Sequence, residues 1–464
     1  MPTILRIDRA RLASEMRASA RLATPLILGQ LSAIGMNSVD ALLAGHLNAH
    51  TLAAVAVATS VWALAIVASI GVMLSVPPSV AQLNGAHRRA DIAPLFAQAI
   101  WLALALGVVL GLAIHFAGPL LPALIGVDAR LTEDVGAFLR AIAFGAPALA
   151  LFASMRGLSE GLGLGRPTMY FALLGPVLLA PLGYVLMYGR LGVPSLGALG
   201  AAIATAIVLW VQVFAFATYL LRSRHFRDLN LLQGWARPDP RTIGELLHIG
   251  LPMGVTLLME GGLFVAVALI IGRLGTDIVA SHQVALNVAS IAFMVPLGMA
   301  LATTVRVGNA VGRNDAIGVR HAALASFALT LGTQFFSAGL MATLPTVIAS
   351  LYTSDAAVIA LAGQLLLLAA IFQLSDGIQV VANGALRGLK DTRIPMVISL
   401  VAYWGFGMPV GWWLTFRLDM GARGMWIGLI AGLSAAAILL TTRFWRMSGR
   451  LARVNASAPG NVAA

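Results

Sequence analysis

The sequence predicts an all-α polytopic membrane protein, with twelve transmembrane helices in two six-helix bundles that are related by a parallel repeat. Three observations predict this fold class. The 464 residues are 59% hydrophobic and only 10% charged, with a mean hydropathy of +0.90, whereas a soluble domain keeps about a quarter of its residues charged. Twelve apolar stretches are each long enough to cross a bilayer, and the two halves of the chain resemble each other.

Each predicted span is a run of about 20 mostly apolar residues, the length that a helix needs to cross the hydrocarbon core. The first run follows five arginines, the last of them Arg21. It is longer than the apolar core of a signal peptide and eleven more runs follow, so we expect a retained helix. The twelve spans are centred near residues 35, 65, 105, 147, 178, 208, 260, 291, 330, 368, 404 and 433.

The basic residues between the spans predict the orientation. If the N-terminus is cytoplasmic and the spans alternate, 24 of the 30 basic residues lie on the cytoplasmic side and six lie outside. Cytoplasmic loops carry an excess of Lys and Arg. We therefore expect a multi-pass protein of the cell inner membrane with both termini cytoplasmic.

The two halves of the chain form an internal repeat. Residues Pro25–Ser60 align without a gap with Pro252–Asn287, and ten of the 36 aligned positions are identical. Six spans per copy give both copies the same orientation, which predicts a pseudo-two-fold axis along the membrane normal and a cavity between the bundles. The predicted parts are an N-terminal bundle (1–221), a basic cytoplasmic linker (222–243), a C-terminal bundle (244–446) and a cytoplasmic tail (447–464).

The composition excludes several classes of function. There is no cysteine, so thiolate metal sites and iron–sulfur clusters are absent. The single lysine, Lys390, lies between Leu389 and Asp391, so the chain has no Walker A loop for ATP hydrolysis. The basic residues are spread between apolar runs rather than gathered in one patch, which argues against nucleic-acid binding.

Three carboxylates fall well inside predicted spans: Asp40 in the first, Glu260 in the seventh and Asp376 in the tenth. A carboxylate at the bilayer centre costs about 2.5–3.5 kcal/mol, so such residues usually face protein or a wet cavity and mark ion or substrate paths. Each could exchange a proton for a metal ion or an organic cation. The alternative is a carboxyl that is satisfied by a neighbouring helix.

Other polar and aromatic residues are weaker candidates for substrate contact. Gln283 and Asn287 are four apart, so they share a helix face and could present amides to a cavity. An interhelical hydrogen bond explains them equally well. Phe264 and Phe372 could form part of an adaptable apolar surface, although plain packing is the better default for each.

Five motifs, Ser38–Gly45, Val80–Gly85, Ala280–Asn287, Arg306–Asn309 and Ala385–Asp391, together carry a family resemblance. Over nearly its whole length the chain resembles the multidrug and toxic compound extrusion (MATE) transporters of the NorM type. The resemblance implies two six-helix bundles around a central cavity, and export of amphipathic or cationic compounds driven by inward Na⁺ or H⁺.

The resemblance also implies roles for individual residues. Glu260 and Asp376 match the cation-site carboxylates of the C-terminal bundle, where they would bind Na⁺, and Asp40 matches the acid of the N-terminal bundle. Gln283 and Asp355 match positions associated with substrate contact.

Three positions depart from the pattern of similar proteins. Phe372 stands where a Tyr often accompanies the cation-site Asp, so one oxygen near that site is missing. Leu179 and Gly183 stand where Asn is frequent, which puts a polar network around Asp40 in doubt. The C-terminal bundle is therefore the predicted place of coupling.

The leading hypothesis is an antiporter for small amphipathic or cationic molecules that acts as a monomer in the lipid bilayer, without an ATPase subunit or a cofactor other than its coupling ion. One alternative is a flippase for a lipid-linked precursor, which would need basic residues inside its cavity to bind a pyrophosphate. Another is a membrane enzyme such as a prenyltransferase, which would need paired Asp-rich motifs for Mg²⁺. The basic residues lie in loops and no D-x-x-D pair is present, so we expect a transporter and not an enzyme.

Overall fold

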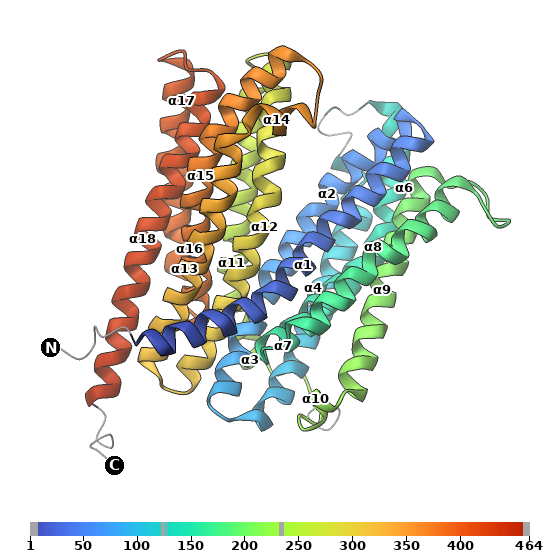
Figure 1. Ribbon diagram of the computed structural model, residues 1–464. Coiled ribbons are helices and arrows are strands. Elements are labelled where there is room, and N and C mark those ends of the chain that lie inside the picture. Colours follow the sequence, from blue (N-terminus) through green and yellow to red (C-terminus); the bar gives the residue numbers. More distant parts are fainter. Residues whose placement is uncertain (1–7, 122–125, 127, 232–235, 458–464) are drawn as a thin grey trace. The chain divides into compact units, whose positions relative to one another are not determined.

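A computed structural model of the chain describes residues 8–121, 126, 128–231 and 236–457 (Figure 1). Arg6 of the N-terminal arginine cluster, residues 232–235 of the predicted linker and the last seven residues of the predicted tail lie outside the described residues. The described part contains twelve helical spans that are long and apolar enough to cross a membrane, and no strand. All twelve predicted centres fall inside these spans, which confirms the predicted fold class.

Several spans are built from more than one helix. The first six spans consist of α1 (Arg9–Leu47), α2 (Ala49–Met73) with α3 (Val76–Gly85), η1 (Arg89–Asp91) with α4 (Ile92–Phe116), α6 (Ala129–Ile142) with η2 (Ala143–Gly145) and α7 (Ala146–Gly161), α8 (Gly165–Tyr188), and α9 (Gly197–Arg222). The short helix α10 (Arg224–Arg227) follows α9.

The other six spans likewise include both single helices and a span that is built from several helices. They are α11 (Pro240–Ile271), α12 (Thr276–Gly312), α13 (Ala316–Thr343), α15 (Ala356–Gly388), α16 (Arg393–Leu400) with η3 (Val401–Gly407) and α17 (Met408–Phe416), and α18 (Ala422–Ser457). The short helix α14 (Pro345–Ser350) precedes α15, and η3 is a π-helical turn.

Local chemistry explains where several of these helices begin. The side chain of Asn48 accepts a hydrogen bond of 2.7 Å from the Thr51 amide and caps α2. Asp315 caps α13 in the same way, by accepting a hydrogen bond from the amide of Gly318. Asn and Asp are among the preferred N-cap residues because they satisfy amides that have no partner within the helix.

The described chain forms two compact units. The N-half unit contains Leu28–Asn84 and Arg88–Gly254, and the C-half unit contains the chain up to Ile27, Gly85–His87, and the chain from Val255 onwards. The long helices α1 and α11 therefore each belong partly to both units. The points at which they change unit are 227 residues apart, which is the offset of the sequence repeat. The predicted boundaries of bundles, linker and tail stay a prediction.

Inside the C-half unit, α12, α13, α15 and α18 pack side by side around one apolar core (Figure 1). Small residues bring these helices close together. A Cβ atom on Gly388 of α15, for example, would lie 2.8 Å from the carbonyl oxygen of Thr304 on α12. Close backbone approach at small residues is a common way to pack helices in a membrane.

Candidate functional site

The two carboxylates predicted for ion coupling lie in the C-half unit, on different helices. Glu260 is on α11 and Asp376 is on α15, and their charges interact with each other. Asp376 is only 2% exposed and Glu260 is half-buried. Two like charges repel strongly where water is excluded, and a cation bound between them offsets that repulsion. The structure thus brings together two of the three carboxylates that the sequence singled out.

A basic residue acts on the same pair. The guanidinium group of Arg387, eleven residues after Asp376 on α15, interacts electrostatically with Glu260. Eleven residues are about three helical turns, so Asp376 and Arg387 lie on the same face of α15. The carboxylate pair therefore has a partial counter-charge in the protein itself.

Two further oxygen-bearing residues, which the sequence analysis missed, lie at the pair. The Nε2 group of Gln379 donates a hydrogen bond of 2.6 Å to the hydroxyl oxygen of Tyr403, and both side chains are wholly buried. The Tyr403 hydroxyl interacts electrostatically with both Glu260 and Asp376. Gln379 could have been found from its spacing of three from Asp376 on one helix. Tyr403 comes from another span, and only the tertiary structure places it here.

Two oxygen atoms in this cluster have unused hydrogen-bonding capacity. Within the described part of the chain, Oδ1 of Asp376 and Oε1 of Gln379 are buried and have no hydrogen-bond partner. Buried polar atoms are normally paired, so each exception calls for an explanation such as an absent ion. Carboxylate and amide oxygens are suitable ligands for hard cations.

A π-helical turn positions Tyr403. In η3 the amide of Met408 donates to the carbonyl oxygen of Tyr403, five residues earlier, and π-turns of this kind are frequent at functional sites. The indole Nε1 of Trp404 donates a hydrogen bond of 3.2 Å to the carbonyl oxygen of Met259, the residue before Glu260. The turn that carries Tyr403 is thus tied to the helix that carries Glu260.

The two phenylalanines predicted for substrate contact belong to one aromatic cluster. Phe264 and Phe372 pack edge to face at 6.1 Å between ring centroids, and Phe372 packs in the same way on Trp426 at 5.7 Å. Phe372 is 3% exposed, whereas Phe264 is partly exposed. Of the two, Phe264 is the one with surface available to a ligand.

Asp40 lies in the N-half unit and is 7% exposed. Its Oδ2 accepts a hydrogen bond of 3.4 Å from Thr205 on α9, and among the described residues its Oδ1 has no partner. Leu179 is wholly buried in an apolar cluster, and a side chain on Gly183 would meet Leu43. Positions 179 and 183, where Asn is frequent in similar proteins, thus give Asp40 no polar side chain here. Thr205 is its polar neighbour instead.

The remaining predicted site residues are exposed. Gln283 and Asn287 both lie on the exposed face of α12. Asp355 caps α15, because its Oδ1 accepts hydrogen bonds from the amides of Ala357 and Val358, at 2.8 and 3.1 Å. Helix capping accounts for Asp355 without a ligand, so a substrate role would be an additional one.

Comparison with known proteins identifies the family. The family model described as MatE matches this chain twice, over residues 25–185 and 252–413. The two matches begin at Pro25 and Pro252, the residues that open the predicted repeat. The chain belongs to the MatE family. The double match confirms the repeat, and the family membership confirms the predicted resemblance.

This MatE protein also matches named relatives along nearly its whole length. It is 50% identical over 441 residues to the "Probable multidrug resistance protein NorM" of Xanthomonas campestris pv. campestris, which covers 95% of this chain and 96% of the relative. It is 39% identical over 447 residues to the "Multidrug resistance protein PmpM" of Pseudomonas aeruginosa, with 96% and 94% covered.

Solved structures support the fold of this MatE protein. The crystal structure of a MATE in the bent conformation matches with a TM-score of 0.87 at 20% identity, covering 97% of this chain and 99% of the other. The eukaryotic MATE transporter AtDTX14 matches with a TM-score of 0.83 at 20% identity, covering 96% and 100%. At such low identity the likeness concerns the fold alone.

Proposed function

We propose that this MatE protein is a multidrug efflux antiporter, which exports amphipathic or cationic compounds in exchange for inward Na⁺ or H⁺. The observation that carries the proposal is the Glu260–Asp376 pair in a chain of this family, with an Asp376 oxygen that is buried and has no partner among the described residues. The names of the multidrug resistance relatives support the substrate class.

The carboxylate pair accounts for coupling in physical terms. When the pair holds no cation, its mutual repulsion raises the free energy of the empty site, and either the coupling ion or a cationic substrate relieves it. Binding of one then disfavours the other, and this linkage is reciprocal. One charge that moves through 100 mV is worth about 2.3 kcal/mol, enough for a substrate concentration ratio of roughly fiftyfold.

The other candidate residues have secondary roles in this proposal. Asp40 would act as a second acidic site, steadied by Thr205. Gln283, Asn287 and Phe264 would contact substrate, since each has an exposed surface. No ATPase subunit is required, because the electrochemical gradient of the coupling ion supplies the energy.

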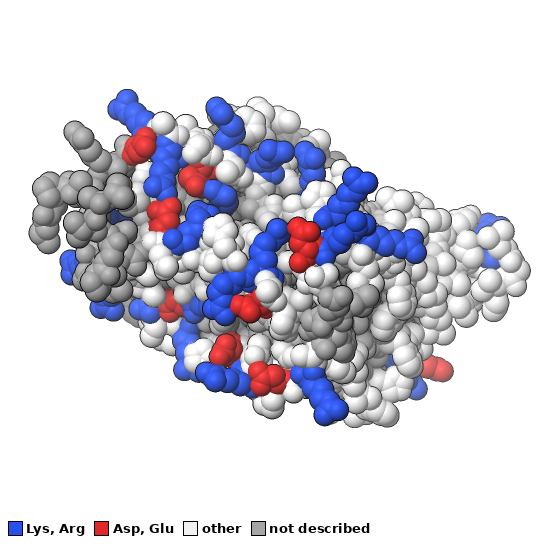
Figure 2. Space-filling view, turned by 90° about the horizontal axis from the view of Figure 1, so that it is seen from below, with Lys and Arg blue, Asp and Glu red and all other residues white. Residues whose placement is uncertain are grey.

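The proposal also fixes an orientation. The chain would lie in the cell inner membrane as a monomer, with both termini in the cytoplasm. Figure 2 shows the surface on which the loop between α3 and α4 lies, and Lys and Arg side chains are abundant on this surface. An excess of basic residues is typical of the cytoplasmic side.

The test measures efflux from cells that lack their own drug pumps. De-energised cells are loaded with ethidium and given a Na⁺ pulse or an acid pulse, and the fluorescence is followed. We expect prompt efflux that Glu260→Gln reduces to the rate of cells without the protein. The matched control is Glu245→Gln, the same change at an exposed residue of α11, which should export normally.

The outcomes separate the hypotheses. Normal export by Glu260→Gln would contradict the assignment of the coupling site. A lack of efflux under both gradients, with the protein confirmed in the membrane, would contradict drug antiport and favour a lipid-linked precursor as substrate.

A further inference from the structure

Phe372 supplies no oxygen to the candidate cation site, whereas two other buried side chains that carry oxygen, Gln379 and Tyr403, are joined by a hydrogen bond near Asp376. Phe372 has no polar atom on its ring, and its edges are covered by Phe264 and Trp426. On the same face of α15, one turn beyond Asp376, Gln379 is wholly buried, and its Oε1 has no partner in the part of the chain that the structure describes. The hydroxyl oxygen of Tyr403 accepts a hydrogen bond from the side-chain amide of Gln379.

We infer that Tyr403 and Gln379 are ligands of the coupling ion, and that they complete with Glu260 and Asp376 an oxygen cage for a small metal cation, Na⁺. The inference rests on the proposed function, because it assigns new residues to the coupling site. The four side chains come from three spans, α11, α15 and the span that contains η3, all in the C-half unit.

The number of oxygens is the reason for choosing Na⁺ over H⁺. A proton needs a single carboxylate oxygen, whereas a hard metal ion needs several oxygen ligands at once. Here two carboxylates are joined by a neutral amide oxygen and a neutral hydroxyl, so the cage gains ligands without gaining charge. A metal ion would also give a ligand role to Oε1 of Gln379, which is buried and has no hydrogen-bond partner among the described residues.

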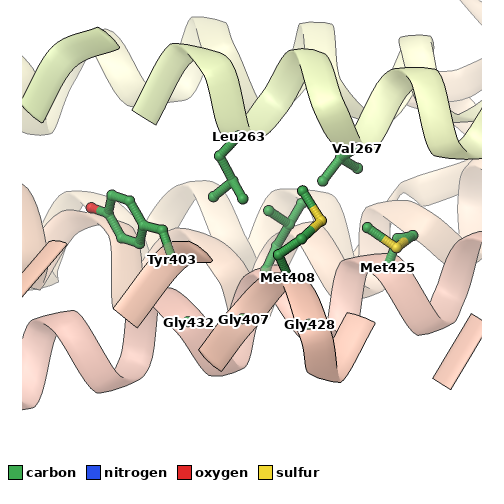
Figure 3. A pocket seen from close by; sticks show the side chains of 9 residues that line it. Leu263, Val267, Tyr403, Gly407, Met408, Met425, Gly428 and Gly432 are labelled. Carbon is green, nitrogen blue, oxygen red and sulfur yellow. The ribbon is translucent and has the colours of Figure 1, made fainter. Parts of the chain in front are cut away.

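The surroundings keep the Tyr403 hydroxyl at the cage. Figure 3 shows the opposite side of the tyrosine, where α11 packs on the π-turn and α18 through Leu263, Val267, Met408 and Met425. The Tyr403 hydroxyl points away from Met408 and Val267 in this view. The apolar seam has no space for a water molecule, so side chains pack closely on this side of the Tyr403 ring.

The test is Na⁺ binding by the purified full-length protein, without any drug. Thermal unfolding is followed while NaCl replaces choline chloride at constant ionic strength, because a ligand that binds only the folded protein raises its Tm. We expect Tyr403→Phe, which keeps the ring, to raise the Na⁺ concentration for half-maximal stabilisation by about tenfold or more. Gln379→Met should act in the same direction.

The matched control is Tyr188→Phe, which removes the same atom at a site in the N-half unit. The Tyr188 hydroxyl donates to the carbonyl oxygen of Leu43 at 2.9 Å. Its loss should lower the Tm at every salt concentration and leave the Na⁺ response unchanged.

Two results would overturn the inference, and neither depends on transport. If Glu260→Gln abolishes the Na⁺ response but Tyr403→Phe and Gln379→Met stay within about twofold of the parent, these residues are not ligands. If the parent protein responds to pH but not to Na⁺, the cage does not bind Na⁺. Ethidium efflux after an acid pulse would then still support the proposed antiport, so the two failures are distinguishable.

Discussion

At the scale of single residues, neighbours decide what a carboxylate does. Asp355 caps α15 and Asp376 lies within it, and the first uses its carboxylate to accept hydrogen bonds from two backbone amides at the helix start. The second is buried beside Glu260 and has an oxygen without a hydrogen-bond partner among the described residues. The carboxylate of Asp355 is satisfied by the amides of its own helix. A buried carboxylate pair, by contrast, becomes stable only when a cation offsets its charge.

The same reasoning gives a rescue prediction for the aromatic position before Asp376. Phe372 is four residues earlier, so the two side chains share a face of α15. We expect Phe372→Tyr, added to Tyr403→Phe, to lower the Na⁺ requirement again, because it returns one oxygen to the site. The measurement is the Na⁺-dependent Tm. A double variant no better than Tyr403→Phe alone would contradict the view that one oxygen substitutes for the other.

At the scale of elements, glycines and the π-turn fix how the last two spans meet. Gly407 ends η3, Gly411 lies on α17, and both face Gly428 on α18. A Cβ atom on Gly428 would meet the backbone of Gly411 and would lie 2.7 Å from the carbonyl oxygen of Gly407. The close contact holds α18 against the span that carries Tyr403.

We therefore expect Gly428→Ala to destabilise the protein by about 1–3 kcal/mol, because the helices must move apart. Gly332→Ala is the control. Gly332 lies on α13, and a Cβ atom there would meet none of the described residues within 4 Å. Ala is a better helix former than Gly by about 0.5–1 kcal/mol, so this variant should be at least as stable as the parent. Thermal unfolding compares them, and equal losses at both positions would contradict the packing argument.

At the scale of the whole molecule, the unit boundaries follow the repeat. Both α1 and α11 change unit at equivalent residues, just beyond the aligned Pro25 and Pro252. Proline inside a helix removes one backbone hydrogen bond and permits a bend. Each repeat thus begins with a helix whose first part packs with one unit and whose remainder packs with the other.

The absence of cysteine in the sequence makes the topology directly testable. We expect Leu191→Cys, in the exposed loop after α8, to react with a membrane-impermeant maleimide in intact cells. Arg227→Cys, exposed on α10, should react only after the cells are permeabilised. The reverse pattern of labelling would contradict a cytoplasmic N-terminus.

The sequence by itself determined the number of spans, the repeat and the family, and it marked three acids inside spans, Asp40, Glu260 and Asp376. Spans are visible because crossing a bilayer demands about 20 apolar residues, and a buried acid such as Asp376 stands out against that background. These signals are local in the chain, so no fold is needed to see them.

Only the tertiary structure decided which residues share a site. Tyr403 is 143 residues from Glu260 in the sequence, and nothing in its own span distinguishes it from a packed aromatic. The π-turn and the packing of three spans place its hydroxyl at the carboxylates. Likewise, only the structure shows that Asp355 caps α15 and that Phe372 packs in an aromatic cluster, and their substrate roles stay a prediction. Contacts between distant segments depend on how whole helices pack, and no residue considered alone in the sequence reveals that packing.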